Sequence, residues 1–121
     1  MFSKVKSLSK PDKIILLKGD DDIILIPQNL IKEILRISSS ESIEAIGCKH
    51  NPEIVVRNPT SKYFIPSQMY EDPKWPAYFS GAGYLMTGNF SKELAETAKQ
   101  VKPVPLDDCW TGILIQQMNK T

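Results

Sequence analysis

The sequence predicts an α/β protein with a mixed sheet flanked by helices. Short apolar runs rich in Ile, at residues 14–17 and 23–26, are typical of strands near a core. Apolar residues at a spacing of three to four, typical of one helical face, recur in later segments. Both patterns occur within 121 residues, a length that suits one domain. Because only roughly three or four strands can be recognised by this pattern, we expect a thin sheet that lacks some strands.

The first half of the chain predicts a strand, an acidic turn and a helix. The first strand spans Lys13–Lys18, and a glycine and three aspartates end it. Extended structure resumes over Ile23–Ile26, and Pro27 suits the first turn of a helix because its missing N–H is not needed there. Ser38–Ser40 ends this helix. Its apolar face consists of Leu30, Ile31, Ile34, Leu35 and Ile37.

The middle of the chain predicts short strands and one long loop. Ser42–Cys48 and Glu53–Arg57 are strand candidates, and Tyr84–Thr87 is a third. Asn58–Pro76 is rich in Pro, aromatic residues and Ser without a clear period. We expect it to be a long ordered loop, which is uncommon in a small domain unless the loop is functional.

Two helices are predicted at the end of the chain. The first begins near Asn89, where Asn89 and Ser91 are good helix caps, and two prolines at 103 and 105 stop it. Its apolar residues are Phe90, Leu94, Ala95, Ala98 and Val101. The second helix spans Asp107–Met118.

Composition excludes several classes of protein. The net charge is +1 and no block of Lys and Arg stands out, so we expect no nucleic-acid partner. Apolar runs of four residues are too short to span a membrane. Cys48 and Cys109 could form one disulfide or remain two buried thiols. His50 is the single His, so a site of His and Cys would lack ligands, and oxygen ligands favour Mg or Mn.

The triplet Asp20-Asp21-Asp22 is the strongest chemical signal in the sequence. Three adjacent carboxylates beside apolar strands repel one another and are costly to desolvate. A divalent cation would remove that cost and keep positions open for phosphate oxygens. In an extended chain Asp20 and Asp22 would share one face and Asp21 the other. The alternative interpretation is a solvated acidic turn.

Two further segments carry possible chemistry. Asp107-Asp108 begins the last helix, where carboxylates either serve the helix dipole or act as a general base aimed into a cleft. Tyr78–Tyr84 places aromatic residues on both sides of Gly81-Ala82-Gly83. This segment is either a tight turn packed by aromatics or a place where the backbone approaches a sugar or base closely.

Taken in order, these segments resemble the β-1,3-glycosyltransferases, the galactosyltransferase and N-acetylglucosaminyltransferase group related to Fringe, over the C-terminal half of the catalytic domain. Five motifs carry the resemblance: Lys18-Gly19-Asp20-Asp21-Asp22-Ile23; Pro27-Gln28-Asn29-Leu30-Ile31; Arg57 with Lys62-Tyr63-Phe64-Ile65-Pro66 and Tyr70; Pro76-Ala77-Tyr78-Phe79-Ser80-Gly81-Ala82-Gly83-Tyr84-Leu85; and Leu106-Asp107-Asp108-Cys109-Trp110-Thr111-Gly112. Phe79 departs from the family pattern, which has Cys there, and Asp107 replaces Glu.

The resemblance implies a partial GT-A fold and a Mn²⁺ (or Mg²⁺) site of the DXD type. It implies that Asp22 and Asp20 hold the metal, that Asp21 lies near the donor ribose, and that Asp108 is the general base. Transfer from a UDP-sugar would invert the anomeric carbon and give a β-1,3 linkage. The donor-side residues would be Gly81, Ala82 and Gly83, and the acceptor-side residues would be Tyr78 and Tyr84.

The resemblance also implies what to expect around the chain. Residues 1–121 would be one partial domain, with the family's nucleotide-binding first half, metal-binding His segment and membrane anchor outside it. The partners would be a UDP-sugar and a glycan acceptor on protein or lipid, on the luminal side of the Golgi membrane. One alternative is a non-catalytic remnant that binds glycan or a full-length glycosyltransferase. Another is a metal-dependent phosphate-ester hydrolase that uses the same aspartates.

Overall fold

The structure is a computed structural model, and it describes residues 14–120. Its centre is a three-stranded sheet in the order β1-β3-β2, formed by β1 (Ile15–Gly19), β2 (Ala45–His50) and β3 (Tyr78–Thr87). Both pairings are antiparallel, so the predicted mixed sheet is wrong for this part of the chain. The reason is that β3 lies between the two earlier strands and runs against each of them, which leaves no parallel neighbours.

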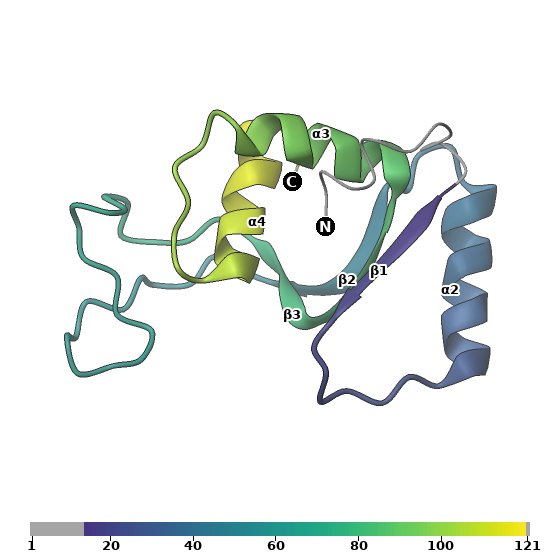
Figure 1. The fold of residues 1–121 in the computed structure, drawn as a ribbon, viewed down its shortest axis with the longest axis horizontal. Helices are drawn as coiled ribbons and strands as arrows, with labels where there is room; N and C mark the ends of the chain where they lie inside the picture. The colour runs from purple at the N-terminus through teal and green to yellow at the C-terminus, as the bar shows by residue number, and fades with distance from the viewer. Residues whose placement is uncertain (1–13, 121) are drawn as a thin grey trace.

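Three helices cover the two faces of the sheet. They are α2 (Pro27–Ser39), α3 (Gly88–Ala98) and α4 (Asp107–Gln117). In Figure 1, α2 stands alone on one side of the sheet, and α3 and α4 lie on the other. The predicted helices are therefore confirmed, and the predicted Pro27 start of α2 is confirmed to the residue.

The sheet register explains this layering. Successive side chains of a strand point to opposite faces. Tyr84 and Met86 of β3 face the helices α3 and α4, where they pack with Phe90, Leu94 and Leu114 in one buried cluster. Leu85, between them, pairs with Leu17 of β1 and with Ile46 of β2. These three residues line an open groove against α2.

Beyond residue 50 the chain forms a long segment without regular strands until β3 begins. It projects away from the sheet at the end opposite α2 (Figure 1). The predicted strand over Glu53–Arg57 is wrong, because only an isolated bridge between Ile54 and Lys74 forms there. The predicted long loop over Asn58–Pro76 is confirmed. A second buried cluster fixes it beneath α4, and its members are Val55, Ile65, Trp75, Tyr78, Val104 and Cys109.

Arg57 orders this loop from inside. Its guanidinium donates hydrogen bonds to the carbonyl oxygens of Ile65 at 2.7 Å, of Tyr70 at 2.7 Å and of Asp72 at 3.0 Å. These carbonyls belong to a chain with no strand partner, so the charged side chain replaces the hydrogen bonds that a sheet would supply.

Two other local predictions are wrong. Residues 23–26 form no strand, and Ile24 is 94% exposed there. These residues pair with no strand of the described sheet, and the chain runs through them from the end of β1 to the start of α2. The cap of α3 is neither Asn89 nor Ser91. Thr87 takes that place, and its Oγ1 accepts a hydrogen bond from the backbone N–H of Phe90 at 3.2 Å.

The segment Ser80–Gly83 lies within β3 and is not the tight turn that sequence favoured. Between the pairs Gly47–Tyr84 and Lys49–Phe79, β2 contributes one residue whereas β3 contributes four, so this segment is an irregularity in the pairing. None of the described glycines has a positive φ. Such irregularities bend a strand and change where its residues face. This one brings Gly81 close to the start of α4.

Candidate functional site

The acidic triplet follows directly from the end of β1. The backbone N–H of Asp20 donates to the carbonyl oxygen of Ala82 at 3.3 Å, which ties the start of the triplet to β3. Asp21 and Asp22 form a turn, and all three residues are exposed. The predicted acidic turn is therefore confirmed, and the alternating faces that an extended chain would give the three aspartates do not occur. The turn forms because Asp20 makes the last contact with the sheet and the chain then leaves it.

The second pair of carboxylates begins α4. The backbone N–H of Asp108 donates to Oδ1 of Asp107 at 2.9 Å, and the N–H of Cys109 donates to Oδ1 of Asp108 at 2.9 Å. Leu106 occupies the cap position and offers no side-chain hydrogen bond. The two aspartates thus supply acceptors for the free N–H groups of the first turn, where the helix dipole also favours negative charge.

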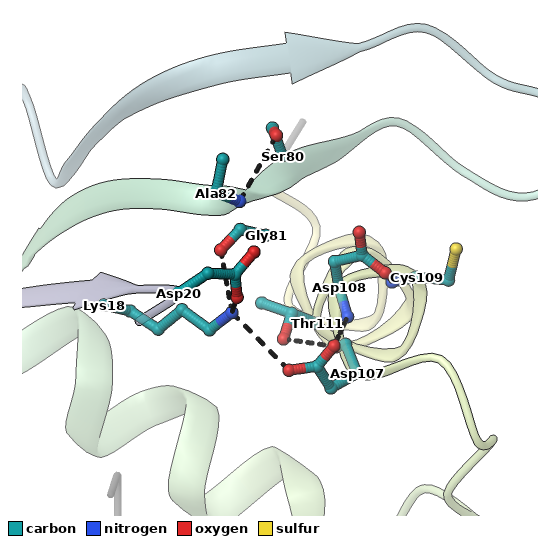
Figure 2. A network of polar contacts seen from close by, with 9 residues as sticks. All are labelled: Lys18, Asp20, Ser80, Gly81, Ala82, Asp107, Asp108, Cys109 and Thr111. Atoms are coloured by element: carbon teal, nitrogen blue, oxygen red, sulfur yellow. Dashed lines mark hydrogen bonds and ion pairs between the residues drawn. The ribbon is translucent and has the colours of Figure 1, made fainter. Parts of the chain in front are cut away.

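Lys18 joins these two acidic segments. Its Nζ donates a hydrogen bond to the carbonyl oxygen of Gly81 at 2.9 Å. The same Nζ lies 3.6 Å from Oδ1 of Asp20 and 3.6 Å from Oδ2 of Asp107. Figure 2 shows this ammonium group between the end of β1, the middle of β3 and the start of α4. Three segments that are distant in sequence therefore meet at one cation.

Gly81 completes the arrangement because it has no side chain. A Cβ atom built on Gly81 would lie 3.5 Å from Oδ2 of Asp108 and 3.5 Å from Nζ of Lys18. Those are ordinary contact distances, so Gly81 lies directly beside the carboxylate and the ammonium group. The structure thus brings Asp20, Gly81 and Asp108, which the sequence singled out separately, into one site. Gly83 lies further along β3, paired with Gly19, and Ala82 between them is exposed.

The two tyrosines assigned to the acceptor side lie in the core. Tyr78 is 9% exposed and Tyr84 is 5% exposed. Burial, together with a hydrogen bond to Glu53, raises the pKa of Tyr78 well above its usual range. Burial also raises the pKa of Tyr84, so both hydroxyls stay neutral over the physiological range. Their acceptor-binding role stays a prediction.

Cys109 follows Asp108 and lies in the core. Its thiol is 4% exposed, and burial, followed by the nearby charge of Asp108, raises its pKa to about 12. Cys48 is exposed, and both cysteines are free. Of the two alternatives left open by the sequence, the disulfide is excluded, and only one of the two thiols is buried.

The acidic turn offers oxygen ligands but no complete metal cage. Within residues 14–120, no group of three or more His, Cys, Asp or Glu side chains is placed to hold a metal ion. Hard cations such as Mg²⁺ are often bound through one or two carboxylates, with phosphate and water oxygens completing the shell. The exposed carboxylates of Asp20 and Asp22 fit that partial role.

In the sequence, Lys18 is the first residue of the acidic motif, and the motif alone predicts no role for it. The signal was present, because a lysine two residues before an acidic cluster is the nearest available countercharge. What the sequence could not supply is the carbonyl of Gly81, which is 63 positions away and fixes the ammonium group in place.

The chain matches one protein family over nearly its whole length. The model of a family described as "Galactosyltransferase" matches residues 1–120. The chain belongs to the galactosyltransferase family. That is a family of hexosyltransferases, so the expected resemblance to β-1,3-glycosyltransferases is confirmed, and the family match disfavours the hydrolase alternative.

Curated relatives of this galactosyltransferase-family chain have consistent names. It is 28% identical over 115 residues to UDP-GlcNAc:betaGal beta-1,3-N-acetylglucosaminyltransferase 7 of Rattus norvegicus, over 95% of this chain and 29% of the relative. It is 33% identical over 107 residues to the acetylgalactosaminyl-O-glycosyl-glycoprotein beta-1,3-N-acetylglucosaminyltransferase of Mus musculus, over 88% of this chain and 27% of the relative. It is 29% identical over 119 residues to N-acetyllactosaminide beta-1,3-N-acetylglucosaminyltransferase 2 of Homo sapiens, over 98% of this chain and 30% of the relative.

The chain therefore spans less than a third of the length of these relatives. The three-stranded α/β structure is consistent with part of a glycosyltransferase domain. Within residues 14–120, none of the helices is both long enough and apolar enough to cross a membrane.

Proposed function

We propose that the chain carries the acidic part of the active site of an inverting hexosyltransferase. The reaction would move galactose or N-acetylhexosamine from a UDP-sugar to a glycan hydroxyl and form a β-1,3 linkage. The observation that carries this proposal is that Gly81 lies beside Asp108 and is hydrogen-bonded to the Lys18 ammonium group, which also pairs with Asp20. The printed names of the relatives, which describe β-1,3 transfer of N-acetylglucosamine, support it further.

Asp108 is the proposed general base. Its carboxylate takes the proton from the acceptor hydroxyl, and the oxygen attacks the anomeric carbon of the donor sugar. The bond between this carbon and the UDP oxygen breaks, and its electron pair leaves with UDP. A single displacement of this kind inverts the anomeric carbon, so an α-linked donor gives a β-linked product. Asp108 suits this role because it lies at the start of a helix beside Gly81, and Gly81 has no side chain that could cover the carboxylate.

Asp22 and Asp20 are the proposed ligands for Mn²⁺ or Mg²⁺. Such an ion, when bound, neutralises charge on the leaving diphosphate. Lys18 holds one of these carboxylates in the absence of an ion. On the donor side we propose Asp21, Gly81, Ala82 and Gly83. On the acceptor side we keep Tyr78 and Tyr84, whose buried rings would support the wall of the site.

The test is a transfer assay with UDP-N-acetylglucosamine or UDP-galactose and a β-galactoside acceptor. We expect Asp108→Asn to lower kcat by roughly 10²–10⁴-fold, because the amide cannot accept the proton. The matched control is Asp107→Asn, the neighbouring exposed carboxylate in the same helical turn. The Asp107 side chain is 78% exposed and lies 3.6 Å from Lys18, so losing this ion pair should cost less than about tenfold. Transfer that survives Asp108→Asn within about threefold would remove Asp108 as the base.

A second candidate function follows from the partial coverage of the relatives. A chain that spans 27–30% of those proteins could bind glycan, or a full-length glycosyltransferase, without transferring sugar. Glycan binding that is unchanged by EDTA, in a chain without transfer activity, would support this alternative. Under either function we propose the luminal side of the Golgi membrane as the location.

A further inference from the structure

A pocket of about 270 Å³ lies beside Asp108, between the start of α4 and the long loop. Its polar and aromatic lining consists of His50, Glu53, Tyr63, Trp75, Tyr78 and Asp108. Small-molecule pockets begin at about 300 Å³, so this volume suits a single sugar ring rather than a nucleotide. Of these residues, the sequence drew attention to Tyr78 and Asp108 as candidate site residues.

The floor and wall of the pocket are held firmly. The hydroxyl of Tyr78 donates to Oε2 of Glu53 at 3.0 Å, and the Tyr78 ring stacks on His50 with 5.0 Å between centroids. Trp75 is 4% exposed and stacks on Tyr70 with 4.6 Å between centroids. Buried aromatic side chains with fixed partners lose little freedom when a ligand enters. The pocket is therefore largely formed before binding.

Tyr63 provides an exposed aromatic surface at the rim. Tyr63 is 50% exposed, whereas Trp75 and Tyr78 of the same pocket are buried. Its backbone N–H donates to Oγ of Ser61 at 3.1 Å, so the loop position is fixed without the ring. Nζ of Lys62 lies 4.9 Å from the ring centroid. An exposed ring of this kind can stack against the C–H face of a sugar.

The charges of the lining select among ligands. Glu53 and Asp108 carry carboxylates, and His50 adds a hydrogen-bonding ring nitrogen close to Glu53. No Lys or Arg is among the described residues that line the pocket. Inside the pocket the two carboxylates disfavour a phosphate or an acidic sugar, and the Lys62 ammonium group lies outside the lining, over the Tyr63 ring. A neutral sugar, whose hydroxyls donate hydrogen bonds to carboxylates, matches it.

We propose that this pocket binds the terminal neutral hexose of the acceptor, stacked on Tyr63 and hydrogen-bonded to Glu53, with one hydroxyl directed to Asp108. The proposal rests on the proposed function, since it takes Asp108 as the base. Tyr63 and Glu53 then become the residues that contact the acceptor. The relatives named for transfer to βGal indicate galactose as the first hexose to test.

The experiment is saturation-transfer NMR and calorimetry of the 121-residue chain with methyl β-galactoside, without donor. All of the residues that line the pocket in this structure lie between His50 and Cys109, so the 121-residue chain can be tested directly. We expect Tyr63→Ala to raise Kd by about tenfold or more, and Tyr63→Phe to keep it within about threefold because the ring is retained. Glu53→Gln should weaken binding as well. The matched control is Leu35→Ala, which removes a 63% exposed apolar side chain from α2, at the other end of the molecule (Figure 1).

Each outcome of these experiments either supports or overturns the proposed pocket. No binding of methyl β-galactoside up to about 50 mM, or binding that Tyr63→Ala leaves unchanged, would overturn the pocket. Phosphate binding as tightly as the galactoside would also overturn it. Galactoside binding that depends on Tyr63, in a chain without transfer activity, would uphold the pocket while the proposed function fails. Transfer activity with an acceptor KM that Tyr63→Ala leaves unchanged would uphold the proposed function and overturn the pocket.

Discussion

A single ammonium group organises the acidic residues of this protein. Lys18 contacts the carboxylates of Asp20 and Asp107 from a position where its side chain is only 18% exposed. One positive charge cannot balance these two and the carboxylate of Asp108 nearby, so the site keeps a negative excess. A cationic ligand is therefore attracted to it. This charge balance is a property of the residues themselves and does not depend on the family match.

At the same scale, two hydroxyl side chains near the start of α3, those of Thr87 and Ser91, should have opposite effects on stability. Thr87→Ala removes the hydrogen bond that caps the helix and should lower the free energy of unfolding by about 1 kcal/mol. Ser91 is 0% exposed, and its Oγ has no hydrogen-bond partner. Ser91→Ala should therefore raise the free energy of unfolding by about 1 kcal/mol, because an unpaired buried hydroxyl is removed. Urea unfolding of the two variants measures both, and shifts of the same sign would contradict the assignment.

The two thiols should differ in reactivity. The pKa of Cys109 is raised to about 12, so at pH 8 its thiol is protonated, and it is also shielded from solvent. Because the folded pKa is raised, the thiol becomes reactive only at strongly alkaline pH or on unfolding. Cys48 is exposed and should react with iodoacetamide in the native protein. Mass spectrometry should find one modified cysteine natively and two in urea, whereas equal native labelling of both would refute the buried thiol.

Single residues also show where sequence interpretation succeeds. Asp108 and Gly81 were chosen as separate candidates, and they lie side by side because a strand irregularity and a helix start meet there. The sequence predicts Asn89 or Ser91 as the cap of α3, because both residue types cap helices well. Thr87 also caps helices well and lies two residues before Asn89, and residue type alone cannot decide between positions so close together.

At the scale of elements, the long loop depends on Arg57. Arg57→Ala would leave three carbonyl groups without their charged donor. We expect the free energy of unfolding to fall by about 2 kcal/mol or more, and amide exchange to rise across residues 58–72. Arg36→Ala is the control, since Arg36 is exposed and pairs only with Glu33 among the described contacts. Its effect should stay within about 0.5 kcal/mol. Unchanged exchange in the loop of Arg57→Ala would show that hydrophobic packing alone orders it.

The elements that sequence predicted well are those with a strong period. The apolar spacing predicts α2 and α3, and the prolines at 27, 103 and 105 help to set the helix limits. The helix α4 has only a weak apolar period, and the carboxylates of Asp107 and Asp108 mark its start. The apolar run at 23–26 lacks a strand partner and stays irregular, although its composition is that of a strand. The sequence does not predict the start of β3, because glycines interrupt the strand pattern and because the pairing of Tyr78 and Phe79 with β2 is non-local.

At the scale of the whole molecule, one side carries much exposed apolar surface. A groove lies between α2 and the sheet, and four of the apolar residues that line it are exposed: Leu17 at 39%, Ile24 at 94%, Leu25 at 46% and Ile26 at 57%. Two further residues of α2 are exposed as well, Ile31 at 56% and Leu35 at 63%. Surface of this kind promotes association. It also limits what the sequence alone could say, because a periodic apolar face predicts a helix but not what covers it.

This surface gives a prediction about solubility. The double variant Ile24→Lys with Leu35→Glu should reduce concentration-dependent association while changing the free energy of unfolding by less than about 0.5 kcal/mol per site. Ile54→Lys is the control, because Ile54 is 74% exposed and lies in the long loop, away from α2 (Figure 1). Sedimentation velocity over a range of concentrations measures the association. Equal improvement by both variants would mean that net charge, rather than this groove, governs it.

The position of β3 has a consequence for how the chain folds during synthesis. The strand begins at residue 78 yet lies between β1 and β2, which leave the ribosome much earlier. Neither early strand can form its pairing in this sheet until β3 has emerged, so both wait with unpaired edges. The segment from β1 to β3 therefore exposes unpaired strand edges during synthesis, the kind of surface that chaperones bind. The helix α4 follows β3 along the chain and brings Asp108 to strands that have all emerged.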